Sequence, residues 1–131
     1  MIFILITFFY FVISISPGKY IFIEATGRKI GDKARLSSEQ LNKMSNRRIP
    51  YCLRFWYHMM GSGVGTLNLM VKTCPGSTNE KITWQLSGNQ GNKWREGTAP
   101  IYSRYDFYVS LKSIVRTDKI GLCWCNVKSK N

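Results

Sequence analysis

Three segments between Tyr51 and Trp94 decide the fold: Tyr51–Met59 (YCLRFWYHM), Gly61–Leu69 (GSGVGTLNL) and Trp84–Trp94 (WQLSGNQGNKW). Each contains residues that favour β-strands, and the glycines between them permit tight turns. Three of the chain's four tryptophans lie in this stretch. No acid–base pair or nucleophile stands out in it. We therefore interpret it as the framework of a binding surface and not as an active site.

The segment 52–59 alternates in the manner of a half-buried strand. We expect one set of side chains to face the core and the other to face away from it. The core set is Leu53, Phe55, Tyr57 and Met59, and the outward set is Cys52, Arg54, Trp56 and His58. On the outward side, the Arg54 guanidinium is placed to stack on Trp56. We predict that this strand forms a hairpin with the next one, over residues 66–72.

Five further segments have the composition or alternation of short strands, and turn residues separate them. They are residues 20–24, 34–36, 81–86, 105–111 and 120–124. Within residues 81–86 we expect Ile82, Trp84 and Leu86 to point inward. Residues 37–50 are polar and are expected to form a surface loop. Six or seven short strands without a long helical pattern predict an all-β antiparallel sandwich.

The chain is strongly basic, with 19 Lys and Arg against 7 Asp and Glu and a formal net charge of +12. Its 131 residues provide for one domain. The charge favours acidic partners such as anionic polysaccharides or membrane headgroups, although a scattered basic surface also explains it. Arg47-Arg48 is the only adjacent arginine pair and no run of five basic residues occurs. We therefore predict no nucleic-acid partner.

The sequence does not predict an enzyme, a metal site or a bound cofactor. His58 is the only histidine and the seven carboxylates are dispersed, so neither a zinc cluster nor a general acid–base pair can be named. Cysteines stand at four positions, which allow three pairings. They are Cys52, Cys74, Cys123 and Cys125.

Residues 1–16 form an almost wholly apolar leader. It is shorter than the roughly 20 residues of a transmembrane helix and has the length of a signal-peptide core. Three interpretations remain open: a cleaved signal peptide, a short membrane anchor through which the chain associates with the membrane, and a leader without function.

Several motifs resemble those of the MAM domain, the extracellular module of meprins, the A5 antigen and receptor protein tyrosine phosphatase mu. The resemblance covers residues 18–122 and includes Gly31–Ser38 (GDKARLSS), upstream of the segments quoted above. The positions that match the family motifs are expected to be structural. They are Phe55, Trp56, Tyr57, Gly65, Leu67, Trp84, Gly88, Gln90, Gly91 and Trp94.

The resemblance implies a secreted or membrane-associated β-sandwich of jelly-roll type that mediates adhesion without catalysis. Its partner would be a protein on a cell surface or in the matrix, a second copy of the chain included. In the family, the cysteine matching Cys52 pairs with one near the end of the domain, for which Cys125 is the candidate here. The family's N-terminal third has no counterpart, so we expect an incomplete sandwich over residues 18–122, followed by a polar basic tail over 123–131.

Two alternatives to a protein-binding module remain from the sequence. One is a carbohydrate-binding sandwich that engages anionic glycans through its positive charge and exposed aromatic residues. The other is a truncated gene product without independent function.

Overall fold

The computed structural model describes residues 12–15, 18–24, 27–43, 51–73, 78–115 and 122–128. These residues form nine strands in two antiparallel sheets and no helix. The strands are β1 (Val12–Ile15), β2 (Gly18–Glu24), β3 (Lys33–Ser37), β4 (Tyr51–Met60), β5 (Thr66–Thr73), β6 (Glu80–Ser87), β7 (Arg95–Ile101), β8 (Phe107–Ile114) and β9 (Leu122–Lys128). The predicted all-β class is confirmed.

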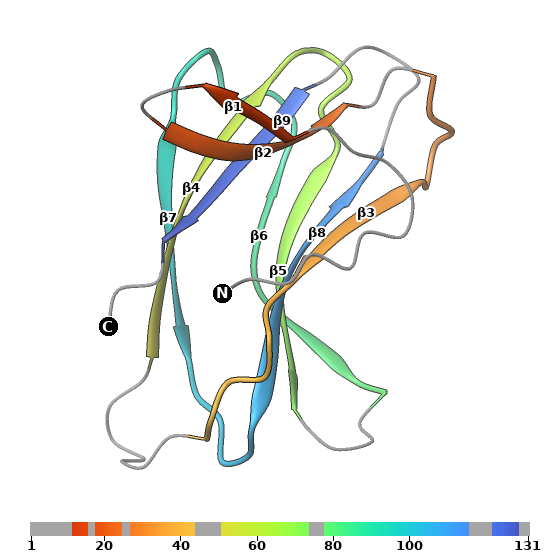
Figure 1. Cartoon of the computed structure of the whole chain (residues 1–131). Helices are drawn as coiled ribbons and strands as arrows, with labels where there is room; N and C mark the ends of the chain where they lie inside the picture. The colour runs from red at the N-terminus through yellow and green to blue at the C-terminus, as the bar shows by residue number, and fades with distance from the viewer. Residues whose placement is uncertain are drawn as a thin grey trace.

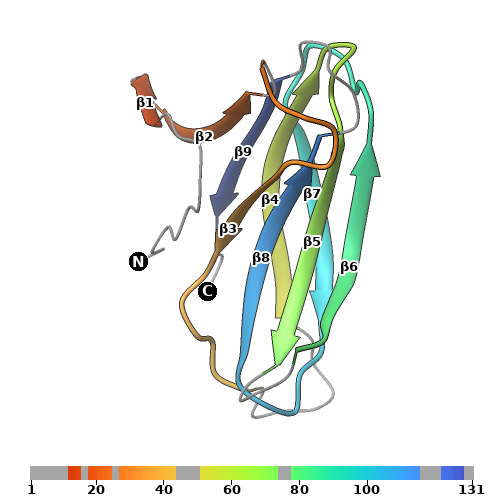
Figure 2. The ribbon, with the colours of Figure 1, turned by 90° about the vertical axis from the view of Figure 1, so that its right-hand side faces the viewer.

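The two sheets pack face to face as a sandwich (Figures 1 and 2). Within the described residues, one sheet has five strands in the order β1-β2-β9-β4-β7 and the other has four in the order β3-β8-β5-β6. From β2 onward, this order is that of a jelly roll, in which the chain passes back and forth between two four-stranded sheets, with β5 and β6 as neighbours in one of them. Strands β2 to β9 occupy all eight positions, whereas the sequence led us to expect that some would be missing.

The core lies between the sheets and is built by the inward residues of β4, β5, β7 and β8. Its most deeply buried large side chains are Phe55, Phe107, Met59, Leu67 and Leu69. The ring of Phe55 on β4 meets Trp84 on β6 edge-on, with centroids 4.9 Å apart and an interplanar angle of 85°. This geometry is favourable for aromatic pairs. The contact therefore links the two sheets at the centre of the molecule.

The alternation predicted for β4 is confirmed, because Phe55, Tyr57 and Met59 are buried while Cys52 and Trp56 are exposed. The predicted hairpin between this strand and β5 is wrong. Strand β4 pairs with β7 and β9, whereas β5 pairs with β6 and β8 in the other sheet. The glycine-rich connection over residues 61–65 crosses from one sheet to the other instead of closing a hairpin.

Strand β7 was not predicted from the sequence, since it contains Gly97 and Pro100, which are poor strand formers. Both residues are tolerated for identifiable reasons. Among the described residues β7 is the edge strand of its sheet and pairs only with β4. Because an edge strand has no second neighbour, the N–H that Pro100 lacks is not needed for hydrogen bonds on that side. Gly97 lies against the Phe55 ring, which occupies the space that a side chain at position 97 would need.

A bulge in the β5–β6 pair overturns part of the predicted orientation of β6. Leu69 lies opposite Trp84, but Met70 lies opposite Ile82, so Thr83 is an extra residue on β6. An extra residue reverses which side chains face the core on its far side. Ile82, which we expected to point inward, is consequently 47% exposed.

Both predicted end segments contribute to the five-stranded sheet. Val12–Ile15, within the predicted leader, forms β1 and pairs with β2. Residues 123–128, within the predicted tail, continue β9, which pairs with β2 and β4. Residues 1–11 and 129–131 lie outside the described residues, so the processing of the leader stays a prediction. The described part of the chain contains no helix long and apolar enough to cross a membrane.

Candidate interaction surface

The outer side of β4 and β7 carries a group of aromatic and charged side chains, which we call the tryptophan face. It comprises Arg54, Trp56, His58, Trp94 and Glu96. Trp56 is 38% exposed and Trp94 is 40% exposed, so both indole rings lie half in solvent. The outward direction of Trp56 follows from the alternation of β4, whose intervening residues fill the core.

An ion pair connects the two strands of the tryptophan face. Glu96 is opposite Trp56 in the β4–β7 register, and the Arg54 guanidinium donates a hydrogen bond to the Glu96 carboxylate across the diagonal. This hydrogen bond, followed by the charge of Glu96, raises the pKa of Arg54. The Glu96 carboxylate thus orients the guanidinium whose stacking on Trp56 stays a prediction.

His58 belongs to the outward set of β4 but is nevertheless buried. Its Nε2 atom donates a hydrogen bond of 3.0 Å to Asn92 Oδ1, and its ring centroid lies 5.6 Å from that of Trp94. The imidazole is therefore covered by the loop that leads into β7, and it supports Trp94 from below.

The loop over residues 88–94 holds Trp94 against β4. Gly88 and Gly91 have φ angles of +77° and +84°, conformations that glycine adopts without strain. The Gln90 N–H donates to the Met59 carbonyl at 2.7 Å. The Arg95 guanidinium donates two hydrogen bonds to the Gln90 carbonyl, at 3.2 and 3.0 Å. Through Gln90, these bonds tie the loop that carries Trp94 to the end of β4 and to the Arg95 side chain at the start of β7.

The other residues of the family motifs lie in the core or in turns. Phe55, Tyr57 and Leu67 are buried, and Trp84 packs partly buried against them. The Gly65 carbonyl accepts a hydrogen bond of 2.9 Å from the Gly88 N–H, which joins the turn after β4 to the turn after β6. The motifs therefore supply the core, the two turns and the tryptophan face.

The strand register separates the two cysteines of the predicted disulfide. Cys52 is exposed and free within the described part of the chain, and Cys125 lies opposite Tyr57. Five residues of strand separate Tyr57 from Cys52, about 16 Å, whereas bridged cysteines have Cα atoms within about 7 Å. This register does not bring Cys52 and Cys125 together. Of Cys123 only the backbone position, opposite Met59, is described, and Cys74 lies outside the described residues.

The described residues contain no group of three or more histidine, cysteine, aspartate or glutamate side chains placed to hold a metal ion. Sequence reasoning missed Glu96 and Asn92, which orient Arg54 and His58. The alternation of residues 96–101 was the available signal, because Gly97, Ala99 and Ile101 are buried while Glu96, Thr98 and Pro100 are exposed. We overlooked it since two of the inward residues are small.

Comparison with known proteins places the chain in a family. The model of the family described as "MAM domain, meprin/A5/mu" matches residues 13–123. MAM domain-containing glycosylphosphatidylinositol anchor protein 1 of Rattus norvegicus is 36% identical over 105 residues, which are 79% of this chain and 11% of that protein. Neuropilin-1a of Danio rerio is 38% identical over 107 residues, again 79% of this chain and 11% of that protein. The chain thus spans about a tenth of the length of these relatives.

A solved structure with the same fold is the K1 cleaved adhesin domain of Lys-gingipain from Porphyromonas gingivalis W83. It has a TM-score of 0.61 at 13% identity and covers 86% of this chain and 75% of its own. At that identity the likeness concerns the fold alone. Taken with the family match over residues 13–123, the jelly-roll strand order and the motif residues in core and turns lead to one conclusion: the chain belongs to the MAM domain family.

Proposed function

We propose that this chain is a non-catalytic, extracellular interaction module that binds a protein partner through the tryptophan face. The observation that carries the proposal is the pair of half-exposed indole rings, Trp56 and Trp94, beside the ion-paired Arg54. Tryptophan and arginine are the residues most enriched among those that dominate binding energy in protein interfaces.

The tryptophan face is pre-organised for binding. Trp56 projects from the rigid strand β4, and the ring of Trp94 packs against the buried His58, which limits the freedom that Trp94 would lose in a complex. Because Arg54 already shares a hydrogen bond with Glu96, its guanidinium is oriented before a partner arrives. Rigid aromatic groups with oriented polar neighbours reduce the entropy cost of association.

A structural role for His58 supports the non-catalytic part of the proposal. The chain's single histidine is buried, hydrogen-bonded to Asn92 and packed against Trp94. Such an imidazole has little access to a substrate, and general acid–base chemistry requires direct reach of the reacting group.

The names of the relatives support an extracellular or membrane-associated location. One is a glycosylphosphatidylinositol anchor protein and another is a neuropilin. In the secretory pathway the cysteines would meet oxidising conditions, in which disulfides persist.

Adhesion of beads carrying the full chain to cell monolayers tests the proposal. We expect adhesion to be lost after the cells are treated with trypsin and retained after treatment with glycosaminoglycan lyases. Aggregation of the beads without cells would identify a second copy of the chain as the partner. Adhesion that resists trypsin, or that disappears with the lyases alone, would contradict a protein partner.

Glycan binding is the second candidate function. The observation that favours it is a pocket at the start of β6 and the end of β7, which shares no residue with the tryptophan face and whose lining includes a lysine and a tyrosine. The +12 charge of the chain would draw anionic glycans toward it.

A further inference from the structure

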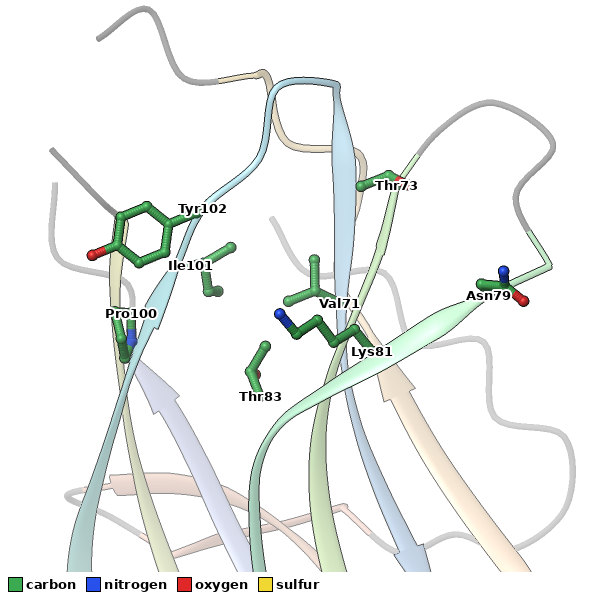
Figure 3. Close-up of a pocket in the computed structure, with 8 residues that line it drawn as sticks. All are labelled: Val71, Thr73, Asn79, Lys81, Thr83, Pro100, Ile101 and Tyr102. Carbon is green, nitrogen blue, oxygen red and sulfur yellow. The ribbon is translucent and has the colours of Figure 1, made fainter. Parts of the chain in front are cut away.

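A pocket opens at the end of the sandwich where β5 ends, β6 begins and β7 ends (Figure 3). Its volume is about 300 Å³. The lining residues come from three strands and the segments that flank them. They are Val71, Thr73, Asn79, Lys81, Thr83, Pro100, Ile101 and Tyr102.

The bulge on β6 places a lysine in this pocket. In a regular ladder Thr83 would lie opposite Met70, Ile82 would face the space between the sheets, and Lys81 would point to solvent, as strict alternation predicts. With the bulge, Lys81 and Thr83 line the pocket and Ile82 is turned outward. Figure 3 shows the Lys81 side chain extending from β6 toward β7, on which Pro100 and Ile101 lie.

No acidic side chain among the lining residues neutralises the positive charge of Lys81. Lys81 supplies an ammonium group, and none of the lining residues is an aspartate or a glutamate. An ammonium is a compact point charge that suits an anionic group without demanding a fixed bidentate geometry. The pocket is therefore electrostatically suited to a single negative group.

The remaining lining suits a sugar ring. Tyr102 stands at the rim with 66% of its surface exposed, and Val71 and Ile101 form an apolar floor. Thr73, Asn79 and Thr83 contribute polar side chains to the lining, and the Thr83 hydroxyl, which donates to the Leu69 carbonyl at 3.3 Å, can still accept a hydrogen bond. A sugar ring has an apolar face of C–H groups and a rim of hydroxyls, so it matches an aromatic wall beside polar groups.

We propose that this pocket binds one monosaccharide unit bearing a carboxylate or a sulfate, with Lys81 at the negative group and Tyr102 against the ring. The volume lies at the lower limit of small-molecule sites, roughly 300–1,000 Å³, which restricts the occupant to about one ring. The inference rests on the second candidate function, and it is independent of the tryptophan face.

Calorimetric titration of the full chain with three disaccharides tests the proposal. The probes are a sulfated heparin disaccharide, an unsulfated hyaluronan disaccharide that carries one carboxylate, and neutral cellobiose. We expect one or both anionic probes to bind more tightly than cellobiose. Binding of the hyaluronan disaccharide as tight as that of the heparin disaccharide would show that a carboxylate suffices, and tighter binding of the heparin disaccharide, which also carries a carboxylate, would show that sulfate contributes. Failure of both anionic probes to exceed cellobiose would overturn the proposal.

Two pairs of matched variants locate the binding. Lys81→Met keeps the aliphatic stem and removes one charge, and Lys29→Met makes the same change at an exposed turn at the opposite end of the sandwich. Tyr102→Ala removes the proposed wall, and Tyr105→Ala removes a tyrosine of similar exposure, 63%, that does not line the pocket. We expect Lys81→Met to weaken anion binding about tenfold and the Lys29 variant to leave it nearly unchanged. Tyr102→Ala should weaken all binding, and Tyr105→Ala none.

Equal losses in the Lys81 and Lys29 variants would show that only the net charge matters, and would overturn the assignment of the site. Retained binding in Lys81→Met or in Tyr102→Ala would do the same. Adhesion of beads to cells and binding of disaccharides are separate measurements. A negative result with the disaccharides therefore leaves the proposed protein-binding function standing, and a negative result with the beads leaves the pocket proposal standing.

Discussion

Phe55 and Gly97 lie directly opposite each other in the β4–β7 pair, and the ring of Phe55 occupies the space that a side chain at position 97 would need. A Cβ atom at Gly97 would come within 2.7 Å of Cε2 and 2.9 Å of Cε1 of this ring, closer than carbon atoms can approach. The same ring meets Trp84 of the opposite sheet. One glycine on an edge strand therefore permits the aromatic contact that joins the sheets.

The first prediction follows from this packing. Gly97→Ala should destabilise the chain by about 1–3 kcal/mol, because the buried Phe55 ring cannot move without disturbing Trp84. Urea unfolding measures the effect, and Thr98→Ala, an exposed change on the same strand, is the control. In a Phe55→Leu background the Gly97→Ala substitution should cost less, since the smaller side chain leaves room. Equal stability of the Gly97 and Thr98 variants would show that the predicted overlap does not exist.

The second prediction concerns the dependence of stability on pH. The hydrogen bond from Arg35 is the largest cause that lowers the pKa of Glu80 from its ordinary value of 4.5, and the charges of Arg35, Lys112 and Lys72 act in the same direction. Partial burial of the carboxyl opposes them. Because the folded pKa lies below the unfolded one, the stabilisation is present above pH 4.5 and is lost as the pH falls through the folded pKa.

Glu80→Gln should therefore lower the free energy of unfolding by about 0.2–1 kcal/mol at neutral pH. The difference from the unmodified chain should shrink as the pH falls below 4.5. Urea unfolding at a series of pH values measures this difference, and Glu39→Gln, at an exposed position, serves as the comparison. If the difference in unfolding free energy between the Glu80 variant and the unmodified chain stays constant down to acid pH, this ion pair has no role in stability.

The third prediction concerns the exposed cysteine. Since the register separates Cys52 from Cys125, we expect Cys52 to react with a maleimide in the native chain. Mass spectrometry of the labelled peptides measures this, with labelling in denaturant as the reference. A native chain that resists labelling at Cys52 and yields a linked Cys52–Cys125 peptide would contradict the β4–β9 register.

The side-chain pattern of single strands could be predicted from the sequence, but the pairing of strands could not. Alternation along β4 correctly separated Phe55 from Trp56, because the period of a strand is a local property. The partner of β4 is a matter of long-range topology, and the glycines at 61–65 are as compatible with a crossing between sheets as with a hairpin. The sequence resemblance was the only signal for the jelly-roll order.

The candidate sites depended on features that leave weak local signals. A single extra residue, Thr83, reversed the direction of Lys81, and no simple alternation rule anticipates a bulge. The partners of Arg54 and His58 lie 42 and 34 residues away along the chain, so only the folded structure brings them together. Trp56 and Trp94 were recognised as motif residues, but their common location on one face required the register of β4 and β7.

The most direct test of the central claim measures the binding of labelled chain to trypsin-sensitive sites on cells, with and without the two tryptophans. The variant carries Trp56→Ala and Trp94→Ala, the control carries Tyr105→Ala, and an unchanged urea midpoint confirms that each is folded. If the tryptophan face is the protein-binding surface, the half-saturating concentration should rise at least about tenfold for the double variant and should not change for the control. Equal binding by the double variant and the unmodified chain would contradict it.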